Sequence, residues 1–292
     1  MIDLNVAWPG AEGARRYVKD SSKIGWSTIG FNVYFKADKN GVQPLKVETD
    51  FNIDNLEEDL DETPVASVDN LMTSVIGTSV CIQDISLGKD FLRRATILLS
   101  EGLKPHTLTK FVESKDYDIL SVIPTCQKTF QSACEIVNCD VINMDVYCLY
   151  SPFKIKRGLV TSALQRGCFF EVSLSGKDIC NALKVHQVVG TNHPGDLSME
   201  YRSNFSYLLR YIPLKKLVIS SGSASLRNIM DPNLIIGMCN ELFTHAIGEP
   251  CDVRCCVTKA PEGCILKGAA RRTYGTGIVS CNKNDTIGQN FI

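Results

Sequence analysis

The residues whose side chains could do chemistry are few in this 292-residue chain, and they stand apart. No histidine has a partner at the spacing of metal ligands; the four are His106, His186, His193 and His245. The 13 cysteines include no CxxC pair, and the tightest group, Cys251 with Cys255 and Cys256, does not have the spacing of a zinc site. We therefore predict no metal centre and interpret these side chains as structural or surface residues.

Motifs for nucleotide binding or nucleophilic catalysis are also missing from the sequence. No P-loop, no GxGxxG after a predicted strand and no GxSxG elbow occurs. The serine-rich turn around Gly222 could bind a phosphate through backbone N–H groups, but an ordinary tight turn is the simpler interpretation. Asp3 and Asp145 are the acids that we place at strand ends, and two carboxylates on non-adjacent strands are weak evidence for catalysis.

Positive charge is the chemistry that remains, although the formal net charge is only −1. Residues 37–70 hold ten acids and two bases, so the rest of the chain carries 29 bases against 22 acids. Many cations fall near predicted element ends, where they can neutralise phosphates. For any single cation a solvated surface position is the simpler interpretation, but as a set they favour binding of a polyanion. The candidate binding residues in this set are Arg93, Arg94, Lys128, Lys154, Lys156, Arg157, Arg166, Arg227, Arg271 and Arg272, and the set also includes Lys215, Lys216 and Lys267.

The stretch 139–176 indicates how such cations are positioned. Two short apolar runs, 141–147 and 168–174, predict strands that are covered on both faces. Between them, apolar residues recur at helical spacing from Ile155 to Leu164. Strand, helix and strand at this length predict a βαβ unit with parallel pairing and a right-handed crossover. Residues 153–170 include four cations and no acid, and these cations lie in the loop after one strand and just before the next.

The same alternation of strand and helix extends along the chain. Further strands are predicted at 2–6, 26–35, 90–100, 117–124, 214–225 and 274–281. Helices are predicted at 11–23, 68–76, 108–115, 125–138, 177–190, 199–211, 232–248 and 252–259. Seven or eight strands over this length predict a (β/α)8 TIM-barrel-like α/β fold, with a doubly wound open sheet as the alternative. We interpret residues 1–292 as a single domain that contains an acidic insertion or flexible loop at 37–70.

Composition limits the class of protein further. Hydrophobic residues make up 44% of the chain and charged residues 22%, which is ordinary for a soluble globular protein. No apolar run approaches the length of a membrane span, and the N-terminus does not have the pattern of a secretion signal. The odd number of cysteines in a chain without that signal predicts reduced thiols in the cytosol or nucleus.

Six segments, in order along the chain, resemble one known family: the roughly 30 kDa protein subunit of nuclear ribonuclease P, especially its yeast forms. The segment 139–175 is the most specific, because it combines an acidic strand, a basic loop, a small helix, an Arg-Gly pair and a strand with a central glutamate. The other matching segments are 1–9, 24–32, 91–100, 117–130 and 217–228. Together they cover most of the chain outside residues 37–90, although the serine-rich turn differs from common forms.

The resemblance implies a fold and a function. The fold would be a barrel distantly related to the metal-dependent phosphoesterases of the polymerase-and-histidinol-phosphatase type. Those enzymes carry a histidine pair on the first strand, where this chain has Asp3, Leu4 and Asn5, so we expect the metal site to be absent. The function would be that of a non-catalytic subunit that binds and stabilises a catalytic RNA. That RNA removes the 5′ leader from precursor tRNA in ribonuclease P, and its relative in RNase MRP acts in ribosomal RNA processing.

The resemblance also implies partners and RNA-contacting residues. The expected partners are the catalytic RNA, precursor tRNA through the complex, and other protein subunits including a small α+β partner, with no membrane. We expect a location in the nucleus and nucleolus, no cofactor on this chain, and Mg²⁺ at the catalytic RNA. The positions that carry over as contacting or positioning RNA, without direct chemistry, are Arg94, Lys128, Lys156, Arg166 and Arg227.

Two other classes of protein stay open. One is a barrel metallo-phosphoesterase that acts alone, and the other is a protein-binding scaffold without RNA contact. Stoichiometric zinc or manganese with phosphatase turnover would favour the enzyme. Salt-dependent binding to structured RNA without turnover would favour the ribonucleoprotein subunit.

Overall fold

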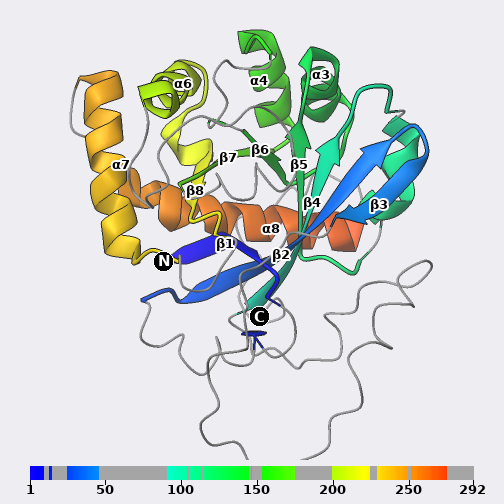
Figure 1. Ribbon diagram of the computed structural model, residues 1–292, viewed down its shortest axis with the longest axis horizontal. Coiled ribbons are helices and arrows are strands. Elements are labelled where there is room, and N and C mark those ends of the chain that lie inside the picture. The colour runs from blue at the N-terminus through cyan, green and yellow to red at the C-terminus, as the bar shows by residue number, and fades with distance from the viewer. Residues whose placement is uncertain are drawn as a thin grey trace, which may run out of the picture.

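The fold is seen in a computed structural model of the chain (Figure 1). The residues that it describes are 1–9, 13–14, 25–45, 91–103, 105–113, 115–144, 146, 153–174, 199–223, 229–248 and 251–274. Among them, no helix combines the length and the apolar character that crossing a bilayer requires.

Parallel strands build a curled sheet in which the strands follow one another in chain order. In the described residues they are β1 (Ile2–Ala7), β2 (Thr28–Asp38), β4 (Phe91–Leu99), β5 (Ile119–Pro124), β6 (Val141–Asn143), β7 (Phe169–Ser173) and β8 (Leu217–Ser220). An additional strand, β3 (Gly41–Leu45), pairs antiparallel to β2. The first and last strands approach through a parallel bridge between Val6 and Ser223, where the Ala7 N–H donates to the Ser223 carbonyl at 2.9 Å. The sheet is therefore a nearly closed barrel.

Helices cover the outside of this barrel and one of its ends. The α-helices are α2 (Thr109–Glu113), α3 (Gln127–Glu135), α4 (Arg157–Gln165), α6 (Met199–Leu209), α7 (Pro232–Ile247) and α8 (Lys259–Tyr274). The 3-10 helices are η5 (Pro105–Leu108), η6 (Leu214–Lys216) and η8 (Val253–Val257). Apolar side chains such as Phe31, Ile97, Phe130 and Phe170 form the large core between the strands and this outer layer.

Local sequence signals explain where these elements begin and end. All six residues of β5 are buried, as expected of a strand covered on both faces. Helix α3 begins where the Thr129 hydroxyl accepts the backbone N–H groups of Thr125 and Cys126, each at 3.0 Å. Helix α7 begins at Asp231, whose carboxylate accepts the Asn233 N–H at 2.7 Å.

The barrel interior is layered. An apolar layer lies where the strands begin, made of Ile2, Leu4, Ile119, Val141, Phe169 and Val218. A smaller apolar group lies toward the ends of the strands, made of Ala7, Tyr34, Leu98 and Ile123. Buried polar side chains fill the level between them, and they include Arg94 and Glu171. Side chains that alternate along each strand produce these layers.

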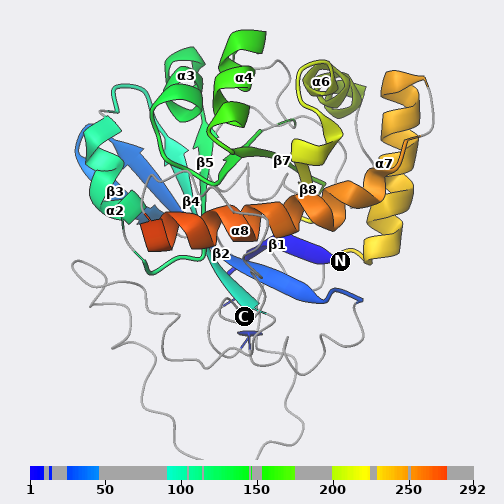
Figure 2. The same cartoon turned by 180° about the vertical axis from the view of Figure 1, so that it is seen from behind.

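Helix α8 closes the end of the barrel at which the strands begin. It lies across the strands, behind them in Figure 1 and in front of them in Figure 2. Its Ala260 and Cys264 complete the first apolar layer. A Cβ atom on Gly268 would lie 2.1 Å from the Asp118 carbonyl oxygen, so only glycine permits this close approach. We call this end of the barrel the closed end and the opposite end the rim.

The structure confirms the predicted TIM-barrel-like α/β fold, and the strand order is that of a barrel instead of a doubly wound sheet. The predicted strand at 274–281 is wrong at its first residue, because Tyr274 ends α8, and its other residues lie outside the described part. Helix α8 escaped prediction because Pro261, Gly263 and Gly268 interrupt its pattern. The helices predicted at 68–76 and 177–190, and most of the one at 11–23, also lie outside the described residues.

The interpretation of residues 37–70 as a loop is wrong for its first part. Ala37 and Asp38 belong to β2, and residues 41–45 form β3. Proline at position 44 argued against a strand there, but β3 pairs only with β2 among the described strands, and an edge strand tolerates proline. Residues 39–40 form the turn between these strands, residues 46–70 lie outside the described residues, and the assignment of residues 1–292 to one domain stays a prediction.

Candidate nucleic-acid interface

Four of the predicted RNA-binding residues gather where two neighbouring helices begin. Lys128 is the second residue of α3, Lys156 is the N-cap of α4, and Arg157 is its first residue. Lys154 precedes them in the connecting loop. All four side chains are exposed, and both helices begin at the rim of the barrel because they follow β5 and β6. We call these four residues the basic rim.

The loop that carries three of these cations is held by its neighbours. Phe153 and Ile155 are buried, and Phe153 stacks on Phe130 of α3 with ring centroids 4.5 Å apart. The Lys154 backbone N–H donates to the Gln127 side-chain carbonyl oxygen at 2.9 Å. The alternation of buried and exposed positions therefore turns Lys154 and Lys156 outward.

The electrostatics of the basic rim favour an anion. The first turns of α3 and α4 contain no acid. Helix N-termini carry unpaired N–H groups and a partial positive charge, and the four cations add to both. None of the four forms an ion pair with another described residue. Lysine and arginine side chains are hydrogen-bond donors without an acceptor, so this surface can bind phosphate oxygens.

Arg94, in contrast, is fully buried inside the barrel. Its guanidinium has five acceptors, which match its five N–H donors. Nη1 donates to Glu171 Oε1 at 2.7 Å and to the Leu4 carbonyl at 3.1 Å. Nη2 donates to Glu171 Oε2 and, at 2.9 Å, to Ser121 Oγ, while Nε donates to Thr96 Oγ1 at 3.1 Å. The expected RNA contact of Arg94 is therefore corrected to an internal ion pair.

The polar residues around this pair complete its surroundings. Asn143 donates to Glu171 Oε2 at 2.9 Å, which adds a third hydrogen bond to that carboxylate. Desolvation lowers the pKa of Arg94 and the charge of Glu171 raises it, with a net upward shift that keeps the cation charged. Gly30 is needed here because a Cβ would lie 2.6 Å from the Leu4 oxygen that Arg94 contacts.

Arg271 and Arg166 also have structural partners. Arg271 is 6% exposed, and its Nε donates to Asp140 Oδ2 at 3.0 Å while Nη2 donates to the Tyr117 carbonyl at 3.1 Å. Arg166 lies at the far end of α4 from Lys156, and its Nη1 and Nη2 donate to the carbonyls that end α3, including Cys134 at 2.9 Å. Arg271 is therefore excluded from an RNA-facing surface, and Arg166 is committed to a helix C-terminus.

Arg93 and Arg272 meet at the closed end, away from the basic rim. Both contact the carboxylate of Asp118: Arg93 Nε lies 3.4 Å from Oδ2 and Arg272 Nη1 lies 2.7 Å from Oδ1. Their side chains are 26% and 30% exposed. Arg227 lies outside the described residues, so its predicted role stays a prediction.

The acids that the sequence placed at strand ends form no metal site in the described part of the chain. No three histidine, cysteine or acidic residues described there lie close enough to hold a metal ion. Asp3 is buried, and its Oδ1 accepts the backbone N–H groups of Asn5 and Ser221, each at 3.2 Å. The hydrogen bond from Ser221 uses one backbone N–H of the serine-rich turn, so the turn has one donor fewer for a phosphate. Asp145 lies outside the described residues.

Several residues that hold the candidate cations in place were not predicted from the sequence. Glu171 was seen only as part of a motif, although it fixes Arg94, and Asp118 and Asp140 pair with arginines that were assigned to RNA. The signal for Glu171 was an acid at the centre of an apolar strand, which needs a buried partner. Gln127 gave no such signal, because its role depends on a contact with the loop before α4.

Together, the fold and the site define a class: an α/β barrel with an ion-paired interior and an exposed basic rim suited to a polyanion. Residues 1–273 match the model of the family described as RNase P subunit p30. The chain belongs to this family, which confirms the resemblance noted in its sequence.

Two curated relatives were found by sequence comparison. The protein GAMETOPHYTE DEFECTIVE 1 of Arabidopsis thaliana is 31% identical over 143 residues, which cover 47% of this chain and 22% of that protein. The ribonuclease P protein subunit drpp30 of Dictyostelium discoideum is 26% identical over 170 residues, which cover 57% of this chain and 40% of that protein. The chain thus spans less than half the length of these relatives.

Proposed function

We propose that this chain is a protein subunit of ribonuclease P and that it binds the catalytic RNA of that ribonucleoprotein through the basic rim. Its membership of the RNase P subunit p30 family supports the first part. The observation that carries the second part is the group of four exposed cations at two helix N-termini, without an acid in either first turn.

In this proposal the basic rim positions RNA and does not cleave it. Its cations contact backbone phosphates and release counterions, which gives binding a steep dependence on salt and little dependence on base sequence. The RNA, with Mg²⁺, performs the hydrolysis that removes the 5′ leader of precursor tRNA. The buried pair of Arg94 and Glu171 holds the barrel together beneath the rim and has no direct part in catalysis.

The proposal extends to assembly and location through the family resemblance. We expect a second role in RNase MRP, in ribosomal RNA processing, and contact with other protein subunits that include a small α+β partner. These assemblies imply a nuclear and nucleolar location.

Purification of the tagged full-length chain from its own cells tests the proposal. The expected result is recovery of a discrete structured RNA, together with Mg²⁺-dependent removal of the 5′ leader from a precursor tRNA. Digestion of the co-purified RNA should abolish this activity. Recovery of the chain without RNA, or leader removal that survives complete RNA digestion, would contradict the proposal. A second discrete RNA in the same preparation, with cleavage of precursor ribosomal RNA, would support the role in RNase MRP.

A further inference from the structure

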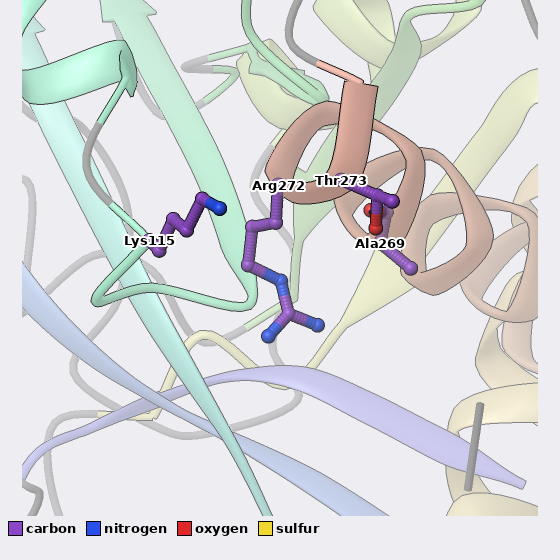
Figure 3. A pocket seen from close by; sticks show the side chains of 4 residues that line it. All are labelled: Lys115, Ala269, Arg272 and Thr273. Carbon is purple, nitrogen blue, oxygen red and sulfur yellow. The ribbon is translucent and has the colours of Figure 1, made fainter. Parts of the chain in front are cut away.

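A small hollow opens at the closed end of the barrel, on the opposite side from the basic rim. It is lined by Lys115, Ala269, Arg272 and Thr273 and has a volume of about 370 Å³ (Figure 3). Three of these residues belong to the last turns of α8, and Lys115 comes from the segment that leads into β5. Two segments that are distant in the sequence therefore build the hollow.

The hollow has an excess of positive charge. Figure 3 shows the Lys115 side chain next to the Arg272 side chain, with its nitrogen toward Arg272. Asp118 is the carboxylate bound to Arg272, but it also accepts the backbone N–H of Arg93 at 2.8 Å and the Arg93 Nε at 3.4 Å. One carboxylate thus serves two guanidinium groups, and Lys115 adds a third cation. Glu113 and Asp116 lie close to Lys115 in the sequence, but neither is among the described residues that line the hollow, where both charged side chains are cations.

One donor at this hollow has no partner. The Arg272 Nε is buried and makes no hydrogen bond, although the same guanidinium is anchored to Asp118 through Nη1. A buried N–H without an acceptor is unfavourable, so the Arg272 side chain can gain a hydrogen bond by turning toward the oxygen atoms of a ligand. The Thr273 hydroxyl donates to the Ala269 carbonyl at 2.9 Å and does not compete for this donor.

The lining of the hollow suits a phosphate group. A phosphate presents several oxygens, which can bridge an ammonium group and a guanidinium fork at the same time. The lining residues that the structure describes include no aromatic ring, so they offer no surface on which a base could stack. The C-terminus of α8 disfavours an anion, so binding must come from the side-chain charges and will be weak for a free ion.

We propose that this hollow is a phosphate-binding subsite, formed by Lys115 and Arg272, for a backbone phosphate of RNA or a free phosphate. This subsite is inferred from the geometry of the hollow alone, and it does not depend on RNA contact at the basic rim. A phosphate here would lie at the other end of the barrel from the rim, so an RNA that reached both would wrap around the protein.

Amide chemical shifts of the full-length protein during titration with sodium phosphate test this subsite, with sodium chloride at equal ionic strength as the reference. We expect phosphate-specific shifts at residues 115–118 and 269–273. Lys115→Glu should weaken phosphate binding at these amides at least fivefold. The matched control is Lys259→Glu, at the exposed first position of α8, which should leave the binding curve unchanged. Lys115 is exposed, so its substitution should not affect folding.

A second titration with structured RNA at constant salt distinguishes the two sources. Shifts at the same amides at far lower RNA concentrations, weakened by Lys115→Glu, would identify RNA backbone as the ligand. Shifts with inorganic phosphate alone would identify a free phosphate. Equal shifts with chloride and phosphate, or equal phosphate affinity in wild type and Lys115→Glu, would overturn the subsite.

Discussion

The arginines inside the barrel and the cations of the basic rim have similar chemistry but opposite surroundings. Arg94 and Arg271 are buried against carboxylates, and Arg166 holds the carbonyls at the end of α3. Lys128, Lys154, Lys156 and Arg157 are exposed and form no ion pair with a described residue. The three arginines therefore stabilise the fold, whereas the four cations of the basic rim face solvent and are free to bind.

The largest expected effect comes from breaking the interior pair. Arg94→Met leaves Glu171 buried without its cation, and the loss of one partner of a buried ion pair typically costs about 3–5 kcal/mol. Urea unfolding should show this decrease in the free energy of unfolding. Below its unfolding transition, the variant should retain the RNA affinity of the wild type.

A double variant separates a buried charge from a packing defect. Arg94→Met with Glu171→Leu removes both charges, and it should recover most of the stability lost in Arg94→Met. If Arg94→Met were as stable as the wild type but bound RNA several-fold more weakly, the division between interior and rim would be wrong.

Removal of the basic rim should weaken RNA binding and leave the stability of the fold nearly unchanged. The four-residue variant with alanine at 128, 154, 156 and 157 should bind structured RNA about 10- to 100-fold more weakly near 0.1 M salt. The slope of log affinity against log salt should fall by about 3, because each phosphate contact contributes about 0.7–0.9. The melting temperature should change little, since these side chains are exposed.

The control for this variant is Lys215→Ala, an exposed lysine before β8. It should leave the affinity and the salt slope within about twofold of the wild type. Equal losses in the control and the rim variant would show that RNA responds to net charge and not to the rim.

Arg166→Ala should destabilise the chain by about 1.5–3 kcal/mol, the range for hydrogen bonds to a charged group. The reason is that Arg166 satisfies carbonyls at the end of α3, including Cys134 at 2.9 Å and Val137 at 2.6 Å. Thermal unfolding measures this effect, and RNA affinity measured on the folded variant should match the wild type. If the variant kept its stability but bound RNA more weakly, Arg166 would contact RNA and would not have the structural role described here.

The smallest expected effect concerns Asp3 and depends on pH. Burial raises the pKa of the Asp3 carboxyl, and its Oδ2 has no hydrogen-bond partner. A carboxyl with a raised folded-state pKa stabilises the fold at low pH, and this contribution is lost as pH rises through that pKa. Asp3→Asn should therefore gain about 1 kcal/mol relative to the wild type at neutral pH and less in acid. A gain that is independent of pH would contradict this explanation.

The elements of the barrel were predictable where apolar pattern alone decides structure. The strands β1, β2, β4, β5 and β7 and the helices α3, α4 and α7 were predicted close to their observed bounds. Helix α8 was not, because its glycines serve close packing against the strands, which only the tertiary structure reveals. The hairpin strand β3 was hidden by its polar composition.

The candidate site was predictable in kind but not in detail. The acid-free basic segment correctly indicated exposed cations at Lys154, Lys156 and Arg157. The burial of Arg94 and Arg271 was not visible, because their partners Glu171 and Asp140 lie 77 and 131 residues away in the sequence. A sequence shows which residues are charged, but it does not show which distant residue each of them pairs with in the folded barrel.

Crosslinking of the assembled ribonucleoprotein by ultraviolet light, with the crosslinked peptides located by mass spectrometry, tests most directly whether the basic rim contacts RNA. We predict that crosslinks concentrate in peptides that contain residues 125–130 and 153–158. The absence of crosslinks from both segments, while other segments of this chain crosslink efficiently, would contradict the account.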